Sequence, residues 1–304
     1  MTAPITAILL AGARPIPDPL AQAAGVPVKP LAPVGGEPMI NRPARALLDH
    51  RAIGQVIILT QRPDAFADHP ATAWLAADPR IRFETCGQGI ASSLLALMES
   101  HALPFPILLT TADHVLLDRA MLDQFVAEAQ GADIAVAMVE RETLLARYPQ
   151  SRRTWLKFRD GWWSGANIFW IGSARARPVI ALWQEVEQDR KKGWKILAAF
   201  GPFALLGALL RLLTLRGGIA RMGRKFGVEA RLVAMAQPEA CIDADKAEDV
   251  TLIETILRDK RFNNPPLAGE VAGRRPDGGV SPYREGDTPP PPLRGGPPPL
   301  TGED

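Results

Sequence analysis

Short runs of apolar residues alternate with stretches of helical periodicity through the first half of the chain. Most of the runs are almost wholly apolar, which is typical of strands buried on both faces of a sheet. The expected strands are 5–10, 55–60, 81–85, 106–110 and 133–139, and the expected helices are 38–49, 64–77, 90–101 and 118–130. This βαβ order predicts a three-layer α/β/α fold with a mostly parallel sheet.

The second half of the chain has a different pattern. Two strands, at 154–158 and 166–171, are expected on either side of an Asp160–Gly161 turn. A helix at 178–192 should follow them, and a late strand at 231–236 and a helix at 246–258 end the patterned part of the chain. These elements extend the same α/β core.

The most apolar stretch of the chain is 196–215, which is close to the ~20 residues of a membrane span. Gly201 and Pro202 interrupt it, and Arg211 lies inside it. We therefore interpret 190–228 as a helical insertion of two packed helices. The alternative is a peripheral membrane contact through 194–216, whose ends are rich in Lys and Arg.

Composition divides the chain into two parts. In 261–304, 19 of the 44 residues are Pro or Gly, so this segment lacks the apolar surface needed to offset its ordering entropy. We expect a disordered tail at 261–304 after a single domain at 1–260. The net charge of +2 gives no sign of a nucleic-acid binder. Two distant cysteines and the lack of a basic region before the first apolar run favour a cytoplasmic protein.

A turn of small residues follows the first strand. Leu10, Ala11, Gly12 and Ala13 would let backbone N–H groups approach a phosphate closely. Two basic residues could add the positive charge that a triphosphate requires: Arg14 directly after the turn, and Lys29 at the end of the following loop. An ordinary strand and loop would also explain this turn if it stood alone.

The whole stretch resembles the signature of the MobA-like nucleotidyltransferases, within the sugar-phosphate and cofactor nucleotidyltransferase superfamily. The matching residues are Leu10, Ala11, Gly12, Arg14, Lys29, Pro30, Leu31, Gly36, Pro38 and Met39. Ala13 replaces the second glycine of that signature, and the loop before Lys29 is longer than usual. The resemblance implies a Rossmann-like sheet of the GT-A type, with Arg14 and Lys29 as the catalytic cations.

Two carboxylates fall where this family holds Mg²⁺. Asp113 follows the fourth expected strand, and Asp245 precedes the last expected helix. Carboxylates at strand ends can hold a divalent cation that bridges phosphate oxygens. The resemblance therefore implies that Asp113 and Asp245 are the metal ligands. Each could instead cap a helix, because acidic residues favour helix N-termini.

The resemblance also suggests where the nucleotide and the acceptor bind. Gly87, Gly89 and Ser92 form a loop before a helix that would pass near the base and ribose, although a plain helix entry is an equal reading. Asn167 matches a position that faces the acceptor in the family. Arg153 could hold an acceptor phosphate, although a solvated basic loop explains it as well.

These observations predict a Mg²⁺-dependent nucleotidyltransferase. It would transfer NMP from an NTP to a small phosphorylated acceptor and release pyrophosphate. GTP and CTP are the NTPs we expect first. One alternative is a nucleotide-sugar-dependent glycosyltransferase on the same fold, against which the Lys29 signature argues. The other is a catalytically silent module that binds a membrane surface, which Ala13 and the apolar stretch keep open.

Overall fold

The computed structural model describes residues 3–12, 18–87, 89–99, 103–188 and 213–263. The expectations for Ala13, for Arg14, for most of the 190–228 insertion and for nearly all of the 261–304 tail lie outside these residues. The chain divides between Lys260 and Arg261. The description below concerns the first of these two units.

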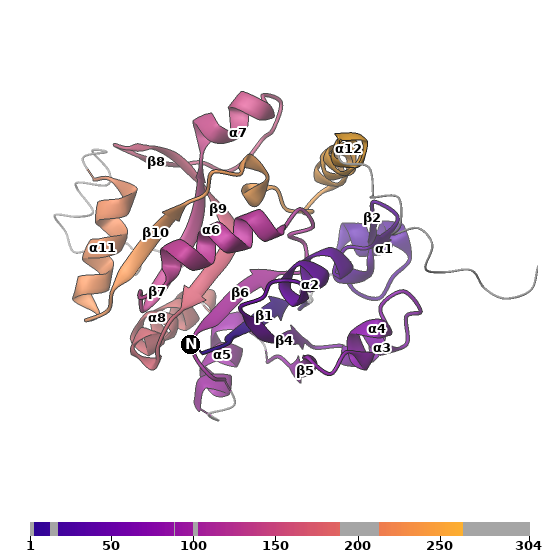
Figure 1. The fold of residues 1–304 in the computed structure, drawn as a ribbon, viewed down its shortest axis with the longest axis horizontal. Coiled ribbons are helices and arrows are strands. Elements are labelled where there is room, and N and C mark those ends of the chain that lie inside the picture. Colours follow the sequence, from indigo (N-terminus) through magenta and orange to yellow (C-terminus); the bar gives the residue numbers. More distant parts are fainter. Residues whose placement is uncertain (1–2, 13–17, 88, 100–102, 189–212, 264–304) are drawn as a thin grey trace, which may run out of the picture. The chain divides into compact units, whose positions relative to one another are not determined.

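A mixed sheet of eight strands forms the centre of the fold (Figure 1). The strand order is β10-β7-β9-β6-β1-β4-β5, with β8 paired to β9. All pairings are parallel except those of β9, which runs antiparallel to β6, β7 and β8. The strands are β1 (Ile5–Leu10), β4 (Ile53–Thr60), β5 (Ile81–Thr85), β6 (Ile107–Thr111), β7 (Ile134–Glu140), β8 (Leu156–Phe158), β9 (Gly161–Ile171) and β10 (Ala230–Ala234). The predicted three-layer fold with a mostly parallel sheet is confirmed.

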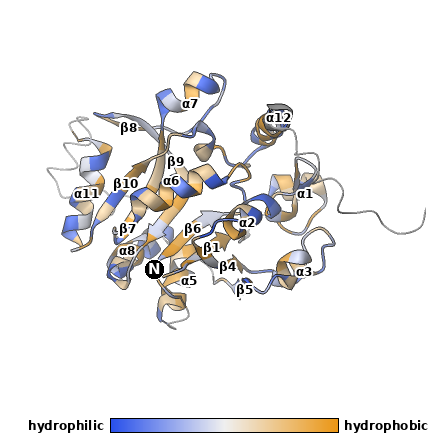
Figure 2. Cartoon of the chain, viewed as in Figure 1, coloured by the Kyte–Doolittle hydropathy of each residue, from blue (hydrophilic) through white to orange (hydrophobic). Residues whose placement is uncertain are grey.

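Helices cover both faces of the sheet because alternate strand residues are apolar on each side. On one face, Ile8 and Ile57 pack with Leu94 of α5 (Ile90–Glu99) and Ile180 of α8 (Arg177–Gln188). On the other face, Leu9 and Ile58 belong to a larger core with α2 (Asn41–Leu48), α6 (Arg119–Ala129) and α12 (Ala247–Asn263). Figure 2 shows the central strands mainly in the colour of hydrophobic residues.

Shorter elements complete the described part of the chain. They are α1 (Pro19–Ala24), α3 (Pro63–Ala67), α4 (Trp74–Ala77), α7 (Arg141–Arg147), α11 (Leu215–Lys225), the 3₁₀ turns η1 (Lys29–Leu31), η2 (Ala174–Ala176) and η4 (Pro238–Cys241), and a two-stranded sheet of β2 (Pro33–Val34) and β3 (Glu37–Pro38). Helix α11 is the described part of the expected insertion. Its Leu215 packs with Leu232 of β10, next to the sheet edge. None of the described helices has both the length and the apolar character needed to cross a membrane.

Two local predictions were wrong. Pro38 does not open a helix, because Gly35 and Gly36 adopt positive φ angles and turn the chain into the β2–β3 hairpin before α2 begins at Asn41. The helix expected at 64–77 is two short helices, α3 and α4. Pro70 lies between them and cannot continue a helix.

Candidate functional site

The carboxyl ends of the parallel strands form one edge of the sheet, where ligands usually bind in such folds. Backbone hydrogen bonds bring the chain together there: Ala112 N–H donates to the Leu10 carbonyl at 2.9 Å, and Cys86 N–H to the Thr60 carbonyl at 3.0 Å. Gly12 lies at this edge. A Cβ at Gly12 would lie 3.3 Å from the side-chain oxygen of Gln61, so a larger residue there would require that side chain to shift slightly.

Lys29 is held over this edge by a well-anchored loop. It opens the 3₁₀ turn η1, and the next two residues, Pro30 and Leu31, are buried in the core. The amide of Ile40 donates to the Pro30 carbonyl at 3.2 Å, which ties the loop to the start of α2. The apolar neighbours of Lys29 therefore fix the base of its long side chain.

Asp113 and the late acidic loop are tied to each other through the backbone. Asp113 lies just beyond the end of β6 at Thr111, and the amide of Ala244 donates to the Asp113 carbonyl at 3.0 Å. Ala244 is fully buried between Asp243 and Asp245. The chain therefore places the predicted carboxylates side by side, although they lie far apart in sequence.

The Lys29 ammonium lies between the two predicted metal ligands. Its Nζ is 2.6 Å from Oδ2 of Asp113 and 2.8 Å from Oδ1 of Asp245. The side chains of Lys29 and Asp113 are 16% and 20% exposed, whereas that of Asp245 is 50% exposed. Burial would lower the pKa of Lys29, but the charges and hydrogen bonds of both carboxylates outweigh it and raise the pKa above 10.5. Lys29 is therefore a cation at neutral pH.

A third carboxylate, Asp243, lies beside this pair and was not among the predicted site residues. Burial raises its pKa to about 8, the charge of Asp113 adds to the shift, and Arg153 and a side-chain hydrogen bond from Asn167 oppose it. The guanidinium of Arg153 lies 4.0 Å from Asp243 and 3.2 Å from Asp249. Asp113, Asp243 and Asp245 together form an acidic cluster. The predicted acceptor residues Arg153 and Asn167 thus both lie beside this acidic cluster.

Asn167 has an unusual backbone. Its φ of 49° makes it the only residue other than glycine with a positive φ in the described ranges. It lies at an irregularity of β9, where the pairing with β7 shifts between Val136 and Met138. Bulges and left-handed residues often aim a side chain into a functional site, and here the Asn167 side chain reaches Asp243.

The strain at Asn167 can be measured with two substitutions that remove the same amide. We expect Asn167→Ala to unfold with about 1 kcal/mol less free energy than Asn167→Gly, because alanine pays the left-handed penalty and glycine does not. Urea denaturation of both variants measures the difference. Equal stabilities would mean that the positive φ stores no strain.

The predicted nucleotide loop is engaged in contacts within the protein. The amide of Gly87 donates to the Ser93 hydroxyl at 3.0 Å, and the Ser92 hydroxyl donates to the Gly89 carbonyl at 2.9 Å. Glu187 of α8 accepts from the amides of Ile90 and Ala91 at the start of α5. Gly87, Gly89 and Ser92 thus follow β5 at the expected edge, and a role in nucleotide binding stays a prediction.

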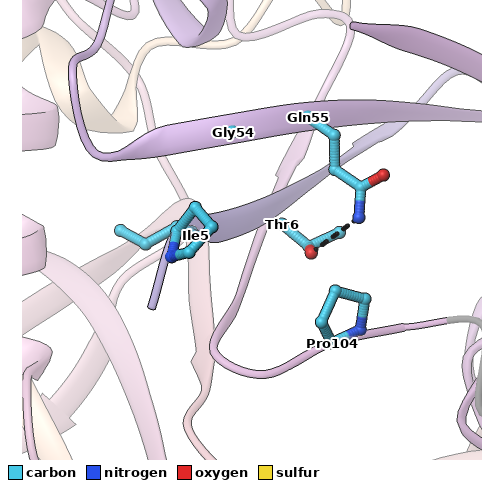
Figure 3. Close-up of a pocket in the computed structure, with 6 residues that line it drawn as sticks. Ile5, Thr6, Gly54, Gln55 and Pro104 are labelled. Atoms are coloured by element: carbon cyan, nitrogen blue, oxygen red, sulfur yellow. Dashed lines mark hydrogen bonds between the residues drawn. The ribbon is translucent and has the colours of Figure 1, made fainter. Parts of the chain in front are cut away.

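The pocket in Figure 3 lies elsewhere. It has a volume of about 220 Å³ and is lined by Pro4, Ile5, Thr6, Gly54, Gln55 and Pro104. These residues lie at or before the amino ends of β1, β4 and β6, opposite the edge that carries Asp113. Within the pocket, the Gln55 amide donates to the Thr6 hydroxyl at 3.1 Å. The pocket therefore has no part in the candidate site.

The residues of the acidic cluster fit a divalent cation whose remaining ligands are phosphate oxygens of the substrate. Asp113 and Asp245 already converge on one cation, and the buried Oδ1 atoms of Asp113 and Asp243 have no hydrogen-bond partner. No group of three or more His, Cys, Asp or Glu side chains in the described ranges is arranged to hold a metal by itself. Mg²⁺ commonly uses one or two carboxylates together with substrate phosphates, which matches this donor set.

Comparisons with known proteins concern the family and the fold. The sequence profile of the MobA-like NTP transferase domain matches residues 20–222. No curated protein sequence matches the chain. A hypothetical transferase from Thermus thermophilus superposes with a TM-score of 0.66 at 26% identity, covering 82% of this chain and 100% of its own.

Two further solved structures share the fold at lower identity. The 4-diphosphocytidyl-2C-methyl-D-erythritol synthase has a TM-score of 0.53 at 15% identity and covers 84% of this chain and 99% of its own. The CMP:2-keto-3-deoxy-manno-octonic acid synthetase, solved with CTP, has a TM-score of 0.50 at 13% identity and covers 86% of this chain and 100% of its own. At these identities the likeness concerns the fold.

Proposed function

Because the chain belongs to the MobA-like NTP transferase family, we propose that it is a Mg²⁺-dependent nucleotidyltransferase. It transfers NMP from an NTP to a small phosphorylated acceptor and releases pyrophosphate. The observation that carries the proposal is the Lys29 ammonium between Asp113 and Asp245 at the carboxyl edge of the sheet. One cation and two carboxylates are the charges that a triphosphate with its metal requires.

The residues of this site work by positioning and by charge. A phosphate oxygen of the acceptor attacks the α-phosphorus, and the bond to the leaving pyrophosphate breaks. Lys29 binds the triphosphate and offsets the charge that develops on it, and Asp113 and Asp245 would hold the metal. Mg²⁺ bound there would supply positive charge that neutralises the phosphates. No covalent protein nucleophile is needed.

The acceptor side of the site involves Asn167 and the Arg153 pair. The Asn167 side chain reaches Asp243 from the β9 irregularity. Arg153 is already paired with Asp249 at 3.2 Å. In the proposed site Asn167 contacts the acceptor. Arg153 binds an acceptor phosphate while its guanidinium also stays paired with the neighbouring carboxylates.

A thermal-shift panel tests the function. GTP, CTP, ATP and UTP are each added with and without Mg²⁺, and two nucleotide sugars serve as controls. We expect one or two NTPs to raise the melting temperature, and only with Mg²⁺. CTP comes first because a fold neighbour was solved with CTP, and GTP is the other nucleotide expected from the sequence. Stabilisation by a nucleotide sugar alone would instead favour a glycosyltransferase.

A cytoplasmic location stays a prediction. The peripheral membrane contact also stays one, since most of 194–216 lies outside the described residues. Of its described end, Leu215 is buried against the sheet edge and Arg216 is exposed. A liposome flotation assay of the full chain would detect such a contact.

A further inference from the structure

The position of Lys29 has a consequence for how the site is loaded. Its ammonium makes short hydrogen bonds to Asp113 at 2.6 Å and to Asp245 at 2.8 Å, so it lies where the two carboxylates converge. A metal ion bound by these same two oxygens, Oδ2 of Asp113 and Oδ1 of Asp245, would lie in this same space. Lys29 and a metal ion therefore compete for one position.

Charge decides how strongly they compete. With Lys29 in place the two carboxylates are half neutralised, and without it they form a pair of like charges that lies partly out of water. A metal ion that enters must displace an ammonium that is mostly buried, and that ammonium then needs another anion. The phosphate groups of a nucleotide are anions of the required kind.

We propose that Lys29 is the resident cation of a two-carboxylate metal site, and that a triphosphate must draw it away before the metal binds tightly. This inference rests on the proposed function for the identity of the triphosphate, but the competition itself needs no nucleotide. The nucleotide-free protein then binds divalent cations weakly. Metal and triphosphate load together, which protects the acidic cluster from occupation by metal alone.

The competition is measured with Mn²⁺ alone on nucleotide-free protein, by electron paramagnetic resonance or calorimetry. We expect Lys29→Met to bind Mn²⁺ about 10-fold more tightly than the natural chain, a typical size for the coupling between two ligands. Lys246→Met is the matched control. It removes the same charge from an exposed position next to Asp245. Among the ion pairs of the described residues, none joins the Lys246 side chain to Asp113, Asp243 or Asp245. Its Mn²⁺ affinity should change less than 3-fold.

Equal Mn²⁺ affinity in the natural chain and in Lys29→Met overturns the proposal, whether or not the protein proves to be a nucleotidyltransferase. Conversely, failure of every NTP in the thermal-shift panel would remove the proposed function and leave this competition measurable. The two ideas can therefore fail separately.

A second measurement uses the natural chain, in case Lys29→Met does not fold. Trace acetylation followed by mass spectrometry reports how reactive each lysine is. We expect Lys29, shielded by two carboxylates, to react several-fold faster at saturating Mg²⁺ than without metal, whereas Lys246 should react at the same rate in both. Unchanged reactivity of Lys29 at Mg²⁺ concentrations that saturate the protein would overturn the proposal.

Discussion

Lys29→Met should retain the fold and lose turnover by a factor on the order of 10²–10³, the usual effect of removing a charge aimed at a transition state. The fold should survive because the loop is anchored by buried Pro30 and Leu31 rather than by the lysine. Steady-state release of pyrophosphate, with the NTP identified in the thermal-shift panel, measures the loss. Circular dichroism verifies the fold.

The same substitution also leaves Asp113 and Asp245 without their shared cation. We therefore expect Mg²⁺ alone to raise the melting temperature of Lys29→Met more than that of the natural chain. Lys246→Met again serves as the control and should retain near-normal turnover. Normal turnover in Lys29→Met would contradict the central role given to this residue.

Part of this site could be predicted from the sequence. Asp113 comes just after β6, whose apolar pattern is clear, and parallel strands end at a common edge. Lys29 and Asp245 do not follow strands and were predicted from the family resemblance. The sequence could not show that Lys29 bonds both carboxylates. That contact depends on the backbone hydrogen bond from Ala244 to Asp113, which joins two loops far apart in the chain.

Asp243 shows that a local sequence pattern cannot tell which of two neighbouring carboxylates is buried. In an Asp-x-Asp pair on an extended chain, both side chains would point to the same face, and neither is distinguished by its neighbours. The structure distinguishes them by burial: Asp243 is 7% exposed and lies against Arg153, whereas the side chain of Asp245 is half exposed. Burial of this kind is set by the tertiary fold.

The wrong helix at 64–77 and the wrong start at Pro38 have a local cause. In both places helix-compatible residues surround a helix-breaking residue that interrupts the helix. It is Pro70 in the first case and the Gly35–Gly36 pair in the second. The glycine pair carried a turn signal in the sequence. Pro38 resembles the first-turn proline of a helix in the sequence, but in the structure it ends the hairpin strand β3.

The last prediction concerns the two carboxylates. Asp113→Asn and Asp245→Asn should each raise the Mg²⁺ concentration needed for half-maximal turnover by about 10-fold or more, since even residues that only support metal ligands change affinity by about 10–100-fold. Expressed as free energies, the loss of Mg²⁺ affinity in the double variant should be smaller than the sum of the losses in the two single variants, because the first change already breaks the shared site. A Mg²⁺ titration of turnover in the three variants measures this.

Helix capping is the competing explanation, and the structure provides its control. The N-cap of α6 is Asp118, whose carboxylate accepts from the Met121 amide at 3.1 Å, so Asp113 does not cap that helix. Asp118→Ala should lower the free energy of unfolding by about 1 kcal/mol and leave the Mg²⁺ requirement unchanged. Asp113→Asn should show the reverse pattern. If Asp245→Asn kept the Mg²⁺ dependence of the natural chain, Asp245 would hold only Lys29, and Asp113 would bind the metal with the phosphates and without Asp245.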